Sequence, residues 1–160
     1  MNGYELINTV VTQKIGLRTS NKLIESQNSK YEGFMFSIDT TMFRSRTAKL
    51  TPKKMGYFVV FWEKDSEGSN QPYTYENSPD KLVINIIDNK QIGQFIFPKD
   101  ILLKQRILKS DNINGKMAMR VYPDWVTELN KTAYKTQQWQ MPYFINMAST
   151  TEKIKRLYLD

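Results

Sequence analysis

Hydrophobic positions near the start of the chain follow a helical period. Over residues 4–15, apolar side chains recur at intervals of three or four positions, which predicts an amphipathic helix of about three turns. Gly16 is a typical residue to end such a helix. The pattern also favours a second short helix over residues 17–27. We therefore expect residues 1–30 to form an N-terminal helical segment.

Beyond this segment the period changes to the alternation that is typical of strands. Residues 34–38 place three apolar side chains on one face, and a turn leads into a second strand over residues 42–49. Successive side chains of a strand point to opposite faces. Arg44 and Arg46 are therefore expected to lie together on the face opposite Phe43.

Further strands are predicted where short apolar runs lie between polar or turn-forming residues. They are residues 57–62, 82–87, 93–98 and 117–122. The run YFVVFW at residues 57–62 is apolar at every position, which is typical of a central strand covered on both faces. A short polar stretch between residues 82–87 and 93–98 predicts a hairpin. The predicted sheet region is therefore residues 31–122.

The last part of the chain is predicted to be helical again. A short helix is expected over residues 99–104, and residues 123–149 form a C-terminal helical region that Pro142 interrupts. Residues 150–160 are an amphipathic, basic tail for which the pattern allows both docking and fraying. Helices followed by sequential strands and then helices predict a single α+β domain over residues 1–160.

The composition excludes several classes of enzyme. The chain has no Cys and no His, so thiolate nucleophiles, Ser-His-Asp triads and the usual zinc sites are ruled out. Any catalysis would depend on carboxylates, Lys, Tyr, Ser or Thr, with Mg²⁺ as the natural metal. We assign no catalytic or metal-ligating residues and expect no cofactor. There is no basic leader before a long apolar run and no span of about 18 apolar residues, so we expect a cytoplasmic protein that does not engage a membrane.

The formal net charge of +7 is unevenly distributed along the chain. Residues 42–64 carry six basic side chains and one acidic side chain, whereas residues 65–90 carry two basic and five acidic ones. A concentrated basic segment favours a polyanionic partner. The alternative is a well-solvated basic surface without a ligand.

The segment FRSRTAKLTPKK is the strongest candidate for binding phosphate. Neighbouring Arg side chains grip phosphate oxygens, and Lys side chains add looser charge. A second basic group follows a glycine loop, although its arginine is equally suited to pairing with an acidic neighbour. The candidate phosphate contacts are Arg44, Arg46, Lys49, Lys53, Lys54, Lys116 and Arg120. The alternative for the strand is a charged outer face that protects a sheet edge from aggregation.

Aromatic residues make up 12% of the chain, and several lie at predicted strand ends or in loops. Unpaired bases of a single strand stack on such rings, whereas a duplex does not need them. Tyr57, Trp62, Tyr122 and Trp125 are the candidates for stacking. The alternative is that these rings pack in the core.

One literal motif matches the letters PD…DxK of Mg²⁺-dependent nucleases. It consists of Pro79-Asp80 and then Asp88-Asn89-Lys90. That chemistry requires two carboxylates on one metal ion. Asp80 and Asp88 lie at the two ends of one predicted strand, roughly 26 Å apart when extended. We therefore interpret the match as a coincidence.

Four stretches of the chain resemble the MepB-like family of small bacterial proteins. They are YEGFMFSIDTTMFRSRTAKLTPKKMGYFVVFWEKD, SPDKLVINIIDNK, GQFIFPKDILLKQRILKS and GKMAMRVYPDW. The resemblance covers roughly residues 30–148. It implies a fold similar to the core of the PD-(D/E)xK restriction-endonuclease-like proteins, a mixed sheet flanked by helices. It also implies loss of the nuclease signature and a role in binding nucleic acid.

These observations together predict a non-catalytic protein that binds nucleic acid, with RNA or single-stranded DNA preferred. A second hypothesis is a Mg²⁺-dependent nuclease that uses scattered carboxylates such as Glu32, Asp39 and Glu63. A third is an interaction module whose basic face meets an acidic protein partner. The sequence leaves all three open.

Overall fold

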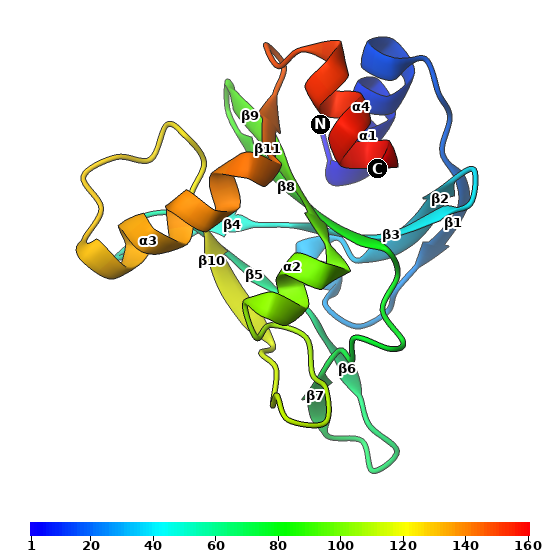
Figure 1. Ribbon diagram of the computed structural model, residues 1–160, viewed down its shortest axis with the longest axis vertical. Coiled ribbons are helices and arrows are strands. Elements are labelled where there is room, and N and C mark those ends of the chain that lie inside the picture. The colour runs from blue at the N-terminus through cyan, green and yellow to red at the C-terminus, as the bar shows by residue number, and fades with distance from the viewer.

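A six-stranded mixed sheet forms the centre of the computed structural model, which describes residues 1–160 (Figure 1). The strands follow one another across the sheet in the order β1-β2-β3-β8-β9-β11. Their bounds are β1 Ser20–Ile24, β2 Phe34–Ile38, β3 Thr41–Thr47, β8 Lys81–Asp88, β9 Gln91–Pro98 and β11 Phe144–Asn146. Neighbouring strands are antiparallel except β3 and β8, which are parallel. The predicted α+β class with a mixed sheet is confirmed.

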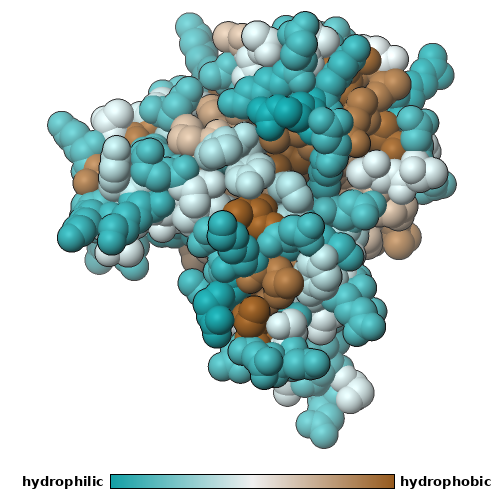
Figure 2. Space-filling view, in the orientation of Figure 1, coloured by the Kyte–Doolittle hydropathy of each residue, from teal (hydrophilic) through white to brown (hydrophobic).

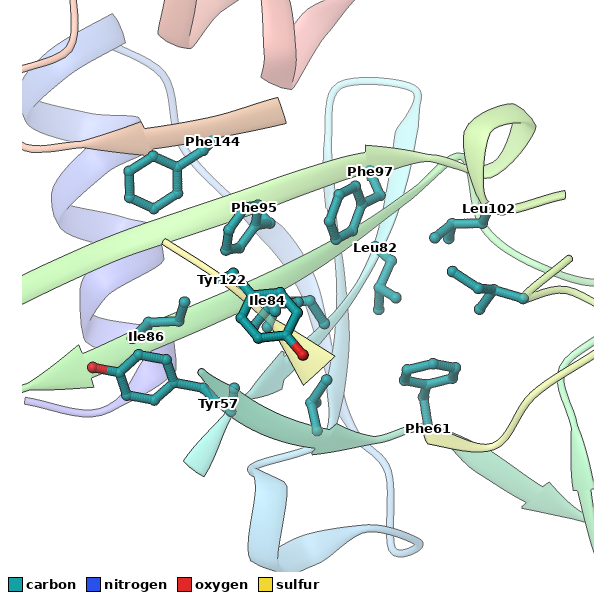
Figure 3. Packing of buried hydrophobic residues seen from close by; sticks show 14 of the residues in the cluster. Tyr57, Phe61, Leu82, Ile84, Ile86, Phe95, Phe97, Leu102, Tyr122 and Phe144 are labelled. Atoms are coloured by element: carbon teal, nitrogen blue, oxygen red, sulfur yellow. The ribbon is translucent and has the colours of Figure 1, made fainter. Parts of the chain in front are cut away.

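A smaller three-stranded sheet packs against one face of the six-stranded sheet. Its order is β10-β5-β4, and a hairpin of β6 and β7 continues from it. The bounds are β4 Lys49–Leu50, β5 Tyr57–Val60, β6 Trp62–Lys64, β7 Asn70–Pro72 and β10 Ala118–Val121. A core of 17 buried residues lies between the two sheets. Tyr57 of β5 and Phe61, which directly follows β5, enter it from one side, and Ile84 and Phe95 of the six-stranded sheet enter it from the other (Figure 3).

Helices cover the opposite face of the six-stranded sheet. α1 Gly3–Thr9 continues as a π-helical turn, η1 Val10–Lys14, and packs with α4 Thr151–Leu159 onto a second core of 15 buried residues. Figure 1 shows α1 and α4 on the side of the sheet away from β5 and β10. The remaining helical elements are η2 Ser29–Tyr31, α2 Lys99–Lys104, α3 Lys131–Gln140 and η3 Met141–Tyr143.

The two cores explain why β8 and β9 are apolar at successive positions. Ile84 and Phe95 belong to the core between the sheets, whereas Val83 and Ile96 point to the core beneath the helices. Both faces of these strands are covered, so a polar side chain on either face costs free energy unless it finds a hydrogen-bond partner. The predicted hairpin is confirmed, with Asn89 in a left-handed turn between the strands.

The prediction of a second helix over residues 17–27 is wrong. Residues 20–24 form β1, which pairs antiparallel with β2 at Leu23 and Met35. Asn21 has φ of 56°, a left-handed conformation that a right-handed helix does not contain. Hydrogen bonds to β2 therefore outweigh the weak local preference for a helix.

The C-terminal region is only partly helical. Residues 123–129 contain no helix, and α3 begins after Asn130, whose side chain caps it by accepting from the backbone N–H of Ala133. The strand β11 was not predicted. The tail forms α4 and docks, since Ile154 and Tyr158 are buried in the core beneath the helices.

None of the helices combines the length and the apolar character needed to cross a bilayer. In the view of Figure 2, hydrophilic residues cover most of the surface, and hydrophobic residues reach it in limited patches, one of them near α2. Most of the large apolar side chains are therefore used between the layers.

Candidate nucleic-acid interface

Arg44 and Arg46 lie on the face of β3 that is turned away from the helices. The alternation placed them correctly on one face, but that face is covered. Only 8% of Arg44 and 0% of Arg46 is exposed. The prediction that these two guanidinium groups hold phosphate at the surface is therefore wrong.

A single carboxylate, Glu25, binds both arginines. Its Oε1 lies 2.7 Å from Nη1 of Arg46 and 3.2 Å from Nε of Arg44. Burial alone would raise the pKa of Glu25. The two guanidinium groups outweigh burial and hold that pKa below its ordinary value of 4.5. Glu25 therefore stays ionised at neutral pH and compensates one of the two buried positive charges.

Tyr73 and Asn28 complete this group, which we call the buried charge cluster (Glu25, Asn28, Arg44, Arg46 and Tyr73). The guanidinium of Arg44 lies 3.5 Å from the centre of the Tyr73 ring. Nη2 of Arg46 donates to the Tyr73 hydroxyl at 2.9 Å. Oδ1 of Asn28 accepts from Arg46 and from the backbone N–H at the start of β6. The cluster therefore connects β3 of the six-stranded sheet to the β6–β7 hairpin, which indicates a structural role.

Two of the four rings predicted to stack on bases belong to the core. Tyr57 is 3% exposed and Tyr122 is 8% exposed, so the prediction is wrong for both. The Tyr57 hydroxyl donates to Asp88 at 2.6 Å and accepts from Nε1 of Trp125 at 3.0 Å. Burial and the bond to Asp88 raise the pKa of Tyr57 to about 12. Trp125 packs against the same core and is held by this bond.

The segment of residues 57–62 is covered on one face only, contrary to the prediction. Tyr57 and Phe61 are buried, whereas Phe58 and Trp62 are half-buried. The reason is that β5 belongs to the smaller sheet, whose Tyr57 and Val59 join the core between the sheets, whereas Phe58 and Val60 point to its other face. This outer face is half-buried and is therefore partly accessible to a ligand.

Three strands place a row of two cations and one ring across this outer face. Phe58 on β5 is paired in register with Lys49 on β4 and with Arg120 on β10. The guanidinium of Arg120 lies 5.9 Å from the centre of the Phe58 ring. Residues directly opposite each other in a sheet point to the same side, so the three side chains share the outer face.

Tyr31 in η2 extends this row at one edge. Nζ of Lys49 lies 5.0 Å from the centre of the Tyr31 ring. The Tyr31 and Phe58 rings meet edge to face with centroids 6.4 Å apart. Phe58 was not predicted as a functional residue. The alternation within residues 57–62 contains the signal, because Phe58 has the opposite parity to the buried Tyr57.

Three lysines surround this row. Lys53 and Lys54, in the loop between β4 and β5, line an open hollow of about 390 Å³ against the start of α3. Lys116 lines a second hollow of about 340 Å³. Arg120 lines both hollows, and neither is lined by a carboxylate. We call the five cations Lys49, Lys53, Lys54, Lys116 and Arg120 the basic sheet face; Phe58 lies among them.

No cation of the basic sheet face is paired with an acidic residue. The ion pairs within 4.0 Å involve only the N-terminus with Glu5, and Arg44 and Arg46 with Glu25. The alternative in which an acidic neighbour neutralises Arg120 is therefore wrong. Arg120 donates to the hydroxyl of Thr51, and its Nε is buried without a partner. The remaining charge of this face is left uncompensated.

A family model described as MepB-like matches residues 25–146 of the chain. The chain belongs to the MepB-like family. Among solved structures, a crystal structure of MepB is 38% identical, with a TM-score of 0.82 over 94% of this chain and 100% of the other. The structure of a bacterial homing endonuclease is 13% identical, with a TM-score of 0.43 over 88% of this chain and 93% of the other. A comparison with curated proteins gave no match.

The carboxylates considered for catalysis lie apart in this MepB-like chain. Glu32 accepts from the backbone N–H of Gly3, Asp39 lies in the turn after β2, and Glu63 accepts from Gln71 of β7. Asp80 and Asp88 lie at opposite ends of β8, as their spacing predicted. No group of three or more Asp or Glu residues in the chain is arranged to hold a metal ion.

Proposed function

We propose that this MepB-like protein binds nucleic acid without cleaving it, through the phosphate groups of a single strand of RNA or DNA held on the basic sheet face. One observation carries the proposal. Five cations come together from two separate segments of the chain, residues 49–54 and 116–120, and none is within 4.0 Å of a carboxylate. Uncompensated charge of one sign is unfavourable for the folded chain on its own and favourable for a polyanion.

The chemistry of the side chains supports phosphate as the ligand group. Arg120 has a planar fork of donors, of which only the bond to Thr51 is made within the chain. Lys49, Lys53 and Lys54 are exposed on flexible stems and supply looser charge. Phosphate contacts give affinity with little sequence specificity, so we expect binding that tolerates many sequences.

The test compares two triple variants of equal charge. Lys49→Gln/Lys53→Gln/Lys54→Gln removes three cations from the basic sheet face, and Lys153→Gln/Lys155→Gln/Arg156→Gln removes three from α4 on the other side of the sheet. Fluorescence anisotropy with a labelled oligouridylate is measured over a range of salt concentrations. We expect the first variant to bind roughly tenfold or more weakly, with a log–log salt slope about 2 units shallower. The second variant should match the wild type.

Two outcomes would contradict the proposal. Equal losses in the two variants would mean that only net charge matters, and binding independent of salt would mean that phosphates are not the ligand. Two further measurements address the other hypotheses. Cleavage of labelled RNA or DNA that needs Mg²⁺ and stops with EDTA would support a nuclease. A preparation free of nucleic acid that captures one acidic protein would support an interaction module.

A further inference from the structure

The outer face of the smaller sheet combines two features that phosphate binding alone does not require. Phe58 is a large apolar ring on the face of β5 opposite the core, and it is only half-buried. It lies between two cations in strict register, Lys49 on one strand and Arg120 on the other. A face that served only to attract phosphate would gain nothing from placing a ring at its centre.

We propose that Phe58 is a base-stacking site, which holds one unpaired base of a single-stranded nucleic acid between phosphates bound by Lys49 and Arg120. The inference rests on the proposed function and adds the class of ligand and the residue that selects it. Neighbouring strands lie about 4.8 Å apart, so the backbones of β4 and β10 are roughly 10 Å apart with β5 midway. A base lying over Phe58 would thus have one cation on each side for the phosphates of its own strand.

The surroundings of the ring leave space for a base. The next position of β5 on the same face is Val60, and its partner on β10 is Ala118. Both side chains are shorter than Phe58, so the surface beside the ring is low along the strand direction. Tyr31 packs against Phe58 in an edge-to-face arrangement and helps to fix the position of the ring. Stacking on an aromatic ring is tolerant of base identity because every base has a flat face.

A double helix cannot use this site, because its bases are already stacked on one another. Duplex DNA would contact Lys49, Lys53, Lys54 and Arg120 through phosphates only. The proposal therefore predicts a difference between strands that carry bases and strands that do not, at equal numbers of phosphates. This difference in affinity measures the contribution of base stacking apart from that of phosphate binding.

The experiment uses three probes of equal length with the wild-type protein. They are a single-stranded oligothymidylate, the same strand made entirely of abasic sites, and a duplex. We expect the oligothymidylate to bind roughly 5- to 100-fold more tightly than the abasic strand at the same salt concentration. Phe58→Leu should remove this preference and leave the affinity for the abasic strand and the salt slope unchanged.

Two further variants keep the result interpretable. Tyr4→Leu is the control, because it removes another ring with a cation above it: Nζ of Lys22 lies 3.8 Å from the centre of the Tyr4 ring. Tyr4 lies in α1, on the other side of the six-stranded sheet, so this variant should not change the preference for bases. Phe58→Trp keeps a ring and adds a fluorescent reporter, which base-containing strands should quench and the abasic strand should not. This variant decides the question if Phe58→Leu does not fold.

The outcomes distinguish this inference from the proposed function. Equal binding of the oligothymidylate and the abasic strand, with normal salt dependence, overturns stacking and leaves phosphate binding intact. A preference for bases that persists in Phe58→Leu, or fluorescence of Phe58→Trp that no strand quenches beyond the change seen in the wild type, also overturns it. Failure to bind any of the three probes overturns both.

Discussion

Replacing Glu25 with glutamine is expected to lower the free energy of unfolding by about 3–5 kcal/mol. The carboxylate of Glu25 is the partner of two arginines that have almost no contact with solvent. The amide of glutamine keeps the size of the side chain but removes its charge. Two buried guanidinium groups would then lie in one cluster with no negative charge to compensate them. Neutralising one partner of a buried ion pair is costly mainly because the charge of the other partner remains buried.

Urea unfolding followed by circular dichroism measures this effect, with Glu76→Gln as the control. Glu76 is an exposed glutamate outside the ion pairs of the chain, so its replacement should change stability by less than about 0.5 kcal/mol. Arg44→Met and the double variant Glu25→Gln/Arg44→Met complete a mutant cycle. A cost for Glu25→Gln as small as that of the control would contradict a structural role for the buried charge cluster.

The same cluster predicts how stability depends on pH. The pKa of Glu25 is lowered in the folded state, chiefly because Arg44 and Arg46 outweigh the effect of burial. A group whose pKa is lowered by folding contributes stability that is complete above its unfolded pKa and is lost as the pH falls through its folded pKa. The stability difference between the wild type and Glu25→Gln should therefore be constant at neutral pH and shrink below about pH 4.5. A difference that grows on acidification would contradict this assignment.

The central strands β8 and β9 could be predicted from the sequence because each of their two faces packs against an apolar core, so that most of their residues are apolar. Residues 82–87 and 93–98 are short apolar runs between turn residues, and they became β8 and β9. Their position between two cores leaves few other structures for such a pattern. The strand β1 could not be predicted in the same way, because all five of its residues are exposed and only its pairing with β2 defines it.

Only part of the candidate site could be predicted, because local alternation tells which side chains share a face but not what covers that face. Alternation gave the face on which Arg44 and Arg46 lie, but not what covers that face. The covering residues, Glu25 and Tyr73, lie 19 and 27 positions away in the sequence. Conversely, residues 57–62 were predicted to form one strand covered on both faces. Residues 57–60 instead form β5 of the smaller sheet, and Trp62 begins β6 of the hairpin. The choice between buried and exposed faces depended on contacts between distant segments, which local periodicity does not contain.

Five of the candidate phosphate contacts could be identified from the sequence because charge is a property of the residue itself. They are Lys49, Lys53, Lys54, Lys116 and Arg120. None of them is fully buried, and the fold brings them together. The ring at the centre of their face was missed for the opposite reason. Phe58 is apolar, and an apolar residue in a strand is expected in the core unless the layer arrangement is known.

Removing α4 is expected to prevent the rest of the chain from folding stably. Three of its side chains anchor the helix, with exposed fractions of 1% for Ile154, 4% for Leu157 and 0% for Tyr158. Each buried side chain of this size contributes about 1.5–3 kcal/mol. Their sum is comparable to the whole stability of a domain, about 5–15 kcal/mol. A chain of residues 1–149 should therefore show no cooperative thermal transition and poorly dispersed amide signals in NMR spectra.

Polar contacts add to this expectation, because α4 also satisfies two buried groups of the sheet. The Tyr158 hydroxyl donates to Oε1 of Gln94 at 2.7 Å, and Nζ of Lys81 donates to the carbonyl of Leu157. Both partners would lose these bonds in the shortened chain, and unpaired buried groups cost about 1–3 kcal/mol each. Lys155→Ala replaces an exposed residue of the same helix, and its free energy of unfolding should be within about 0.5 kcal/mol of that of the wild type. A shortened chain that unfolds cooperatively at the melting temperature of the wild type would contradict this prediction. It would show that the packing of α4 onto the six-stranded sheet is not needed for stability.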